Sequence, residues 1–295
     1  MADRSLEALG YSEVPAEHPL SYPGRPVTEP AVLLPAAREL LPLLVRRRRL
    51  GAWYVDGPEP AQRLDAALDA MGQAGTEQRH PVLAVGCNAS PAQIAHKLAR
   101  LGPSAAVPMV PVRVRGIAVG CSGHISRGGY VACTPYPDPD TESAFVVSWL
   151  DPGQLAAVDA TEIPRYRRAM LPGERFAMTM PSGERLGGAY LYISTYGVLA
   201  GPDGRPRPGG GDQSALLGAL LDASPRLREL LGPDARTWVR RAGADRELRD
   251  QGRRAFREEG WVLPQPGFLP YGLDAAEPYR YGNLPPLGDS PSSLA

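Results

Sequence analysis

The stretch VLAVGCNASPAQIAHKL, residues 82–98, predicts a buried strand that bends into a helix. The apolar run 82–85 is typical of a short buried strand. Ser90 is a favoured N-cap, Pro91 fits the first helical position, and Gln93 is placed to complete a capping box. The bend between strand and helix is Gly-Cys-Asn-Ala, whose successive backbone N–H groups can bind an anion. Many bends of this composition hold no ligand, and this stretch alone favours that simpler interpretation.

The composition excludes several classes of protein. The chain has 295 residues, of which 43% are hydrophobic, and it carries no net charge. This balance argues against nucleic-acid binding, and no apolar run of about 18 residues predicts a membrane span. With no leader pattern at the N-terminus, we expect a cytoplasmic protein. Lys97 is the single lysine among the basic residues, which indicates a GC-rich genome and says little about chemistry.

The cysteines and histidines do not form a recognisable ligand pattern. The three cysteines are widely spaced and contain no CxxC pair, and the four histidines lack paired spacing. This argues against a disulfide framework and against a structural zinc site. We therefore expect no metal.

The middle of the chain is rich in strand patterns. Strands are expected at 82–85, 110–119, 130–136, 143–150, 175–180 and 189–195, with helices at 91–101 and 151–162. This order differs from the regular strand–helix alternation of a doubly wound sheet. We expect an α+β fold in which a closed or strongly curved sheet carries helices on its outside.

Composition divides the chain into three parts. Residues 1–30 are polar and interrupted by proline, and we expect residues 1–80 to form an N-terminal extension that is partly helical. Residues 81–200 form the strand-rich core. Residues 201–295 begin with the Gly- and Pro-rich loop 201–211, continue with helices, and end in a tail rich in Pro, Gly and Tyr.

Four features follow one another in the core. They are VGCN at 85–88, the turn Gly128-Gly129 before a strand, the segment from Leu155 to Glu162, and Tyr166-Arg167-Arg168. This order resembles the gamma-glutamylcyclotransferase-like superfamily, distantly and in its gamma-glutamylamine cyclotransferase type. That family has a Tyr-Gly-Ser-Asn loop, a Gly-Gly strand, a Leu-x-x-Leu-Asp-x-x-Glu helix and a Tyr-x-Arg. The resemblance implies a small mixed β-barrel core with flanking helices.

The resemblance also implies a reaction. In the family, a glutamate takes a proton from the α-amine of a γ-glutamyl amide, the amine attacks the γ-carbonyl, and 5-oxoproline is released without a cofactor. Glu162 matches that glutamate, and the partner would be a small molecule with a γ-glutamyl or similar amide. The residues expected to bind it are Val85, Gly86, Cys87, Asn88, Arg127 and Tyr192. Arg127 is suited to a substrate carboxylate, because guanidinium binds carboxylate bidentately.

Two departures from the family pattern leave other functions open. Val85 stands where the family has Tyr, and Cys87 stands where it has Ser, so substrate recognition is expected to differ. A cysteine at a helix start can act as a nucleophile, with His96 or His124 as its base, in a different amide or acyl transfer. A non-catalytic binding protein is the third alternative, and it predicts a pocket filled by the protein's own side chains.

Each candidate residue also has a purely structural interpretation. Glu162 is followed by arginines, and pairing with one of them would lower its pKa and weaken it as a base. In the same structural interpretation, Cys87 is a small buried residue, Arg127 is a turn residue in solvent, and Tyr192 is an aromatic residue of the core. The oligomeric state stays open.

Overall fold

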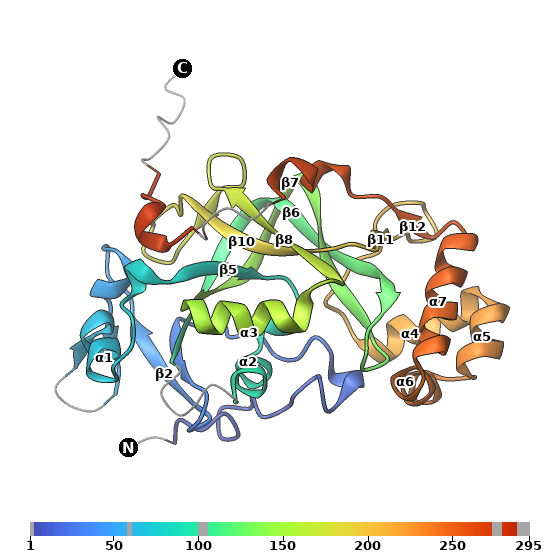
Figure 1. The fold of residues 1–295 in the computed structure, drawn as a ribbon, viewed down its shortest axis with the longest axis horizontal. Helices are drawn as coiled ribbons and strands as arrows, with labels where there is room; N and C mark the ends of the chain where they lie inside the picture. Colours follow the sequence, from blue (N-terminus) through green and yellow to red (C-terminus); the bar gives the residue numbers. More distant parts are fainter. Residues whose placement is uncertain (1–2, 58–60, 100–105, 273–278, 288–295) are drawn as a thin grey trace.

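The chain forms a mixed α+β fold in a computed structural model that describes residues 3–57, 61–99, 106–272 and 279–287 (Figure 1). The strands are β1 (Ala31–Leu34), β2 (Glu39–Leu44), β3 (Tyr54–Val55), β4 (Gln62–Arg63), β5 (His80–Ala84), β6 (Val107–Ile125), β7 (Val131–Leu150), β8 (Tyr166–Pro172), β9 (Met178–Thr179), β10 (Gly188–Ser194), β11 (Val198–Leu199) and β12 (Val262–Leu263). The helices are α1 (Leu64–Ala70), α2 (Pro91–Leu98), α3 (Pro152–Glu162), α4 (Gln213–Ala223), α5 (Pro225–Leu231), α6 (Ala235–Ala244) and α7 (Arg246–Glu258). Short 3₁₀ segments are η1 (Pro19–Ser21), η2 (Leu50–Ala52), η3 (Thr76–Gln78), η4 (Cys87–Ala89), η5 (Pro266–Tyr271) and η6 (Tyr281–Asn283).

The main sheet is open. Its strands are hydrogen-bonded in the order β4-β3-β2-β1-β6-β7-β5-β10-β8, and β9, β11 and β12 join beside β6. The β5–β10 pair is parallel, and the other pairs are antiparallel. No pairing between described residues joins β8 to β4, so the sheet is not the closed small barrel expected from the sequence. The N-terminal segment 31–63 contributes four strands, β1 to β4, at the edge beside β6.

The sheet also crosses the predicted boundary between the N-terminal extension and the core. β1 pairs with β6 through Ala31 and Met109, Val32 and Pro108, and Leu33 and Val107. The segment before residue 80 contains both strands and the helix α1. The division of the chain at residues 80 and 200 stays a prediction.

β7 is longer than the sequence patterns predicted, because it continues through the proline-rich run PYPDPD, with a register shift after Asp138 that leaves residues 139–141 without partners on β6. The N–H of Cys133 donates to the Tyr22 hydroxyl, and its C=O accepts from Tyr166, so neither group points at β6. Pro135 and Pro137 follow at alternate positions and face the same way. Their missing N–H groups therefore remove no hydrogen bond between β6 and β7, which is how a strand tolerates proline.

Two helices lie along one face of the sheet. α2 and α3 pack there through Ile94, Leu98 and Leu155, together with Leu6 of the N-terminal arm. The opposite face packs against a second core that contains Trp149. None of the helices in the described part of the chain combines the length and the apolar character that crossing a membrane requires.

α2 begins as predicted, but the capping box at its start is not formed. Ser90 is the N-cap and makes no side-chain cap hydrogen bond. Gln93 instead accepts the N–H of Ala16 at 3.1 Å, which ties the N-terminal arm to α2. The capping box is at the start of α3, where the side chains of Asp151 and Gln154 each bond the other's backbone N–H. The N–H of Ala16, which takes the place of the Ser90 N–H as donor to Gln93, lies 77 residues before Gln93, so the local sequence gives no sign of it.

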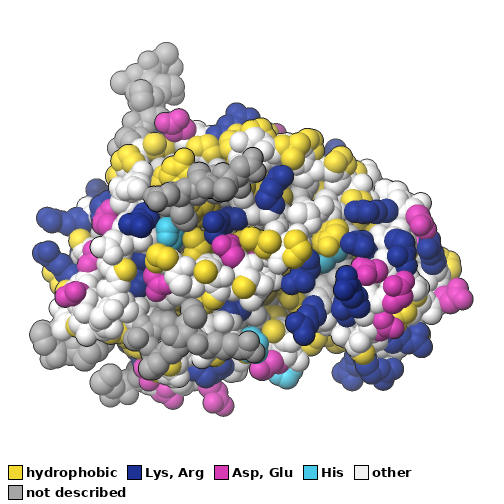
Figure 2. Space-filling model, viewed as in Figure 1, with side chains coloured by type: hydrophobic (Ala, Val, Ile, Leu, Met, Phe, Trp, Pro, Cys, Tyr) yellow, Lys and Arg dark blue, Asp and Glu magenta, His cyan; other side chains and the backbone are white. Residues whose placement is uncertain are grey.

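The C-terminal helices pack on the far end of the β6–β7 hairpin. Their shared core includes Leu217, Trp238 and Phe256 and the strand residues Ile125 and Val131. Arginine side chains, interspersed with acidic ones, gather on the outside of these helices (Figure 2). This helical layer supports the turn that joins β6 to β7.

The hairpin turn is held by α6 at Gly129. The indole Nε1 of Trp238 donates to the Gly129 carbonyl at 2.9 Å, and Trp238 is fully buried. Gly129 has φ of 87°, and a Cβ there would lie 2.6 Å from the Val239 carbonyl oxygen. Glycine is therefore required both by the backbone conformation and by the contact. This fixes the position of Arg127, two residues earlier.

We expect Trp238→Phe to lower the free energy of unfolding by about 1–3 kcal/mol, because the buried Gly129 carbonyl loses its donor. Urea unfolding followed by circular dichroism measures the change. Trp261→Phe is the matched control, since Trp261 is half-buried and makes no recorded side-chain hydrogen bond in the described residues. Equal destabilisation by both substitutions would show that the hydrogen bond does not hold the turn.

Candidate active site

A cavity of about 870 Å³ lies between the bend after β5, the C-terminal end of α3 and the β6–β7 turn. The residues predicted for the site all line it: Val85, Gly86, Cys87, Asn88, Arg127, Glu162 and Tyr192. Segments that are far apart in sequence therefore meet at one opening, although the role of each residue stays a prediction. In the described residues, no three His, Cys, Asp or Glu side chains are grouped as metal ligands would be.

Glu162 is held at the cavity by two neighbours. Its Oε1 accepts from Lys97 Nζ at 2.7 Å and from Asn88 Nδ2 at 3.0 Å. Lys97 also donates to Asn88 Oδ1 at 2.7 Å, so the three side chains form a closed triangle. Oε2 receives no hydrogen bond from the described residues. The carboxylate is therefore fixed through one oxygen while the other stays available to a bound molecule.

The arginines after α3 do not pair with Glu162, contrary to the structural alternative considered for this residue. Arg168 forms an ion pair with Asp159, which lies on α3 about one turn before Glu162. Arg165 donates to the Thr161 carbonyl at 2.9 Å. The charge partner of Glu162 is Lys97, and the side chains of the pair are 13% and 8% exposed respectively.

Lys97 remains charged in this setting. Burial by itself lowers the pKa of its ammonium, but the charge and hydrogen bond of Glu162, with Cys87, outweigh that effect and place the pKa above its usual value. An ammonium that stays protonated cannot be a nucleophile at neutral pH. Lys97 therefore acts as a cation.

The thiol of Cys87 is not activated. Burial raises its pKa to about 12, although the charge of Lys97 acts in the opposite direction. Burial also lowers the pKa of His124 to about 3, and its Nδ1 lies 2.6 Å from Ser122 Oγ. His96 is half-exposed, and its Nδ1 lies 3.4 Å from Oε1 of Glu17. These features count against a Cys87 thiolate paired with either histidine.

Tyr192 and Arg127 occupy contrasting positions on the cavity wall. Tyr192 is nearly buried, packs in the core beside α3 and donates to Asp159 Oδ1 at 2.6 Å. Its hydroxyl is thus already engaged. Arg127 is exposed on the hairpin turn and has no ion pair among the described residues. It lies at the rim with its guanidinium uncommitted.

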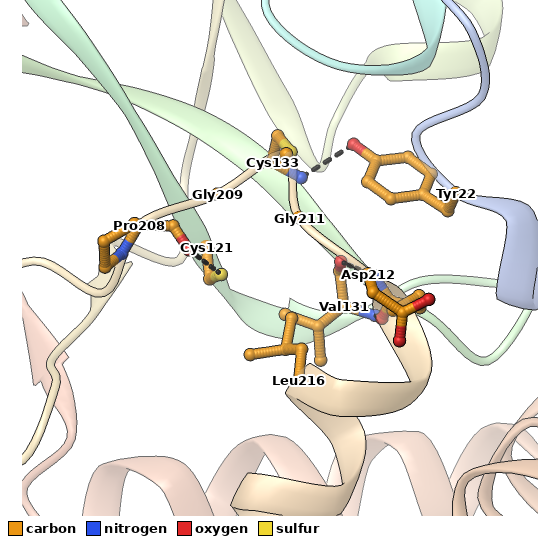
Figure 3. A pocket seen from close by; sticks show the side chains of 11 residues that line it. Tyr22, Cys121, Val131, Cys133, Pro208, Gly209, Gly211, Asp212 and Leu216 are labelled. Carbon is orange, nitrogen blue, oxygen red and sulfur yellow. Dashed lines mark hydrogen bonds between the residues drawn. The ribbon is translucent and has the colours of Figure 1, made fainter.

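Sequence reasoning missed the aromatic wall of the cavity. Tyr22 of the N-terminal arm stacks on Tyr130, with ring centroids 4.2 Å apart, and bonds Cys133 through its hydroxyl. A small cavity of about 40 Å³ lies behind Tyr22 and Cys133, against the loop before α4 (Figure 3). A Cβ on Gly86 would lie 2.3 Å from the Tyr22 hydroxyl oxygen. Gly86 is thus needed for the close approach of a side chain 64 residues away, for which the local sequence carries no signal.

We expect Cys87 to react slowly with iodoacetamide at neutral pH, because a pKa of about 12 leaves little thiolate. The rate should keep rising through about pH 10, whereas a free thiol with a pKa of about 8.5 levels off. Peptide mapping by mass spectrometry measures the rate, and an isolated peptide of residues 84–90 is the control. Alkylation as fast as that of the peptide would restore the thiolate alternative.

Comparison with known proteins gives a distant structural resemblance. No family model matches the chain, and no curated protein matches its sequence. A solved gamma-glutamyl cyclotransferase is 14% identical with a TM-score of 0.31, over 39% of this chain and 66% of that chain. A solution structure of an Arabidopsis thaliana protein is 16% identical with a TM-score of 0.32, and the match covers 52% of this chain and 87% of that protein. An uncharacterized Homo sapiens protein is 16% identical with a TM-score of 0.31, and the match covers 40% of this chain and 68% of that protein. The chain is a distant structural neighbour of gamma-glutamyl cyclotransferase, and similarity at this level carries no argument about reaction or substrate.

Proposed function

We propose that the cavity binds a small γ-glutamyl amide and cleaves it by cyclotransfer, releasing 5-oxoproline and an amine. The observation that carries this proposal is the placement of Glu162. Its carboxylate lines the same cavity as the Gly86–Asn88 bend, is held on Oε1 by Lys97 and Asn88, and leaves Oε2 unoccupied by the described residues. A positioned carboxylate with one available oxygen is what a general base requires.

The reaction needs no group beyond those at the cavity. Glu162 takes a proton from the substrate's α-ammonium, and the freed amine nitrogen forms a bond to the γ-carbonyl carbon. The carbonyl oxygen gains negative charge, and in this proposal the backbone N–H groups at the start of η4 stabilise it. The C–N bond to the leaving amine then breaks as Glu162 gives its proton to that nitrogen. The ring nitrogen loses a second proton, which Glu162 also passes to the leaving group, so 5-oxoproline keeps one N–H and the amine departs as an ammonium. Because nucleophile and electrophile belong to one molecule, the protein mainly has to orient the two ends.

Two observations favour this proposal over the alternatives. The raised pKa of Cys87 argues against a thiolate nucleophile in a different acyl transfer. A non-catalytic protein was expected to fill the pocket with its own side chains, whereas the cavity beside Gly86, Cys87 and Glu162 is open. Both alternatives therefore lack the feature that they required.

We expect Glu162→Gln to reduce 5-oxoproline formation by roughly 10²- to 10⁴-fold, which is the usual contribution of a general base. Gln keeps the size of the side chain and can still accept from Lys97. A panel of γ-glutamyl amides is incubated with the protein, and 5-oxoproline is quantified by mass spectrometry. Glu174→Gln, an exposed carboxylate change outside the cavity lining, is the control and should leave turnover unchanged.

Either of two outcomes would contradict the proposal. Full activity of Glu162→Gln would remove Glu162 from the mechanism. No 5-oxoproline from any γ-glutamyl amide with the wild-type protein would remove cyclotransfer itself.

A further inference from the structure

The wall of the cavity contains an ion pair that protein stability does not explain. Lys97 Nζ and Glu162 Oε1 are 2.7 Å apart, and both side chains are largely removed from solvent. Buried ion pairs often cost as much in lost hydration as they gain in attraction. Lys97 is also the only lysine in a chain that otherwise uses arginine. A compact pair of opposite charges at an open cavity is better explained by a ligand.

The geometry of the pair matches one chemical group. An α-amino acid carries its ammonium and its carboxylate on the same carbon, through two bonds of about 1.5 Å each. The two charges of such a head group are therefore as close together as Lys97 Nζ and Glu162 Oε1. When the head group binds beside the ion pair, its ammonium can contact Glu162 while its carboxylate contacts Lys97.

We propose that Lys97 binds the α-carboxylate of the substrate's γ-glutamyl group and that this contact releases Glu162 to act as the base. This inference rests on the proposed cyclotransfer, because it assigns the substrate's amine to Glu162. One resting ion pair is exchanged for two: Lys97 with the substrate carboxylate, and Glu162 with the substrate ammonium. Lys97 is thereby a binding residue for the head group and a positioning residue for the base.

The exchange removes an obstacle in the resting site. In the resting site Lys97 Nζ lies 2.7 Å from Oε1 of Glu162, so a substrate ammonium can approach this carboxylate only through Oε2. Once the substrate carboxylate attracts the ammonium of Lys97, Oε1 can accept from the substrate ammonium as well. Only substrates with the correct head group then meet an active base.

Asn88 is placed to keep both residues in position during the exchange. Its Oδ1 accepts from Lys97, and its Nδ2 donates to Glu162. When the direct contact between the two charged groups opens, each therefore retains a hydrogen bond to the same carboxamide. Asn88 lies in η4, which is fixed between β5 and α2.

Arg127 is the rival cation for this carboxylate. It was predicted from the sequence to bind a substrate carboxylate, and it lines the same cavity. The α-carboxylate, however, shares its carbon with the amine that Glu162 must reach, so its binding partner has to adjoin Glu162. Lys97 contacts Glu162 directly, whereas no ion pair or hydrogen bond joins Arg127 to Glu162 in the described residues. The geometry therefore favours Lys97.

The test compares two ligands that differ only at the α-carboxylate. L-Glutamine carries the zwitterionic head group, and its α-carboxamide analogue carries the ammonium alone. Calorimetry on the full chain measures the binding of both. We expect the wild type to prefer L-glutamine by about tenfold to hundredfold, the effect of one charge-assisted hydrogen bond.

The variants isolate Lys97, and the double variant does so without leaving a buried charge unpaired. Glu162→Gln alone keeps Lys97 and should keep the preference for L-glutamine. The double variant Lys97→Met with Glu162→Gln is neutral at both positions and should lose the preference to within about twofold, while Lys97→Arg retains part of it. Arg127→Met tests the rival cation and should keep the wild-type preference for L-glutamine over its α-carboxamide analogue.

The outcomes separate this inference from the proposed function. Unchanged preference in the double variant, loss of preference in Arg127→Met alone, or no binding of L-glutamine to the wild type at millimolar concentration would each overturn the role of Lys97. If L-glutamine binds through Lys97 but no γ-glutamyl amide yields 5-oxoproline, the head-group site stands and the cyclotransfer falls. If 5-oxoproline forms but its rate is the same for substrates with α-carboxylate and α-carboxamide, the cyclotransfer stands and this inference falls.

Discussion

The antiparallel pairing of β6 with β7 is the constraint on which the arrangement of the cavity depends. The register runs from Met109 opposite Ser148 to Ile125 opposite Val131, with irregularities at two points. β5 is placed on the other side of β7, and its last residue leads into the bend. α3 follows β7 after Asp151, and the β6–β7 turn carries Arg127. All three sides of the cavity are thus attached to one hairpin, so its register sets their mutual positions.

The electrostatics of the site follow from burial in that frame. Low solvent access makes a lone charge costly, so Lys97 and Glu162 occur as a pair and Asn88 satisfies both. The same burial keeps Cys87 protonated and His124 neutral, since each loses more hydration by ionising than its neighbours restore. Lys97 and Glu162 are therefore the ionised pair at the bend, and Cys87 and His124 serve there as packing and hydrogen-bonding surface.

The local parts of this arrangement were predictable from the sequence, and the long-range parts were not. The strand before the bend, the helix that begins at Pro91 and the helix that ends at Glu162 follow from apolar runs and start signals within a few residues. The edge strands β1, β2 and β4 and the open sheet were missed, because the pairing of β1 with β6 joins residues that are distant in sequence and leaves no local pattern. Lys97 was attributed to composition, since its partner Glu162 lies 65 residues away. The meeting of the seven candidate residues at one cavity was accessible only through an ordered set of motifs.

The N-terminal arm shows why the predicted core does not by itself define the site. Tyr22 passes under the bend, where Gly86 makes room for its hydroxyl, and it bonds the backbone of Cys133 on β7. Gln93 of α2 accepts from the arm at Ala16. The arm therefore links the bend, α2 and β7, and it supplies part of the cavity wall. Glycine in the bend leaves space for a side chain of the same chain, and the ligand that we propose is instead met by Asn88, Lys97 and Glu162.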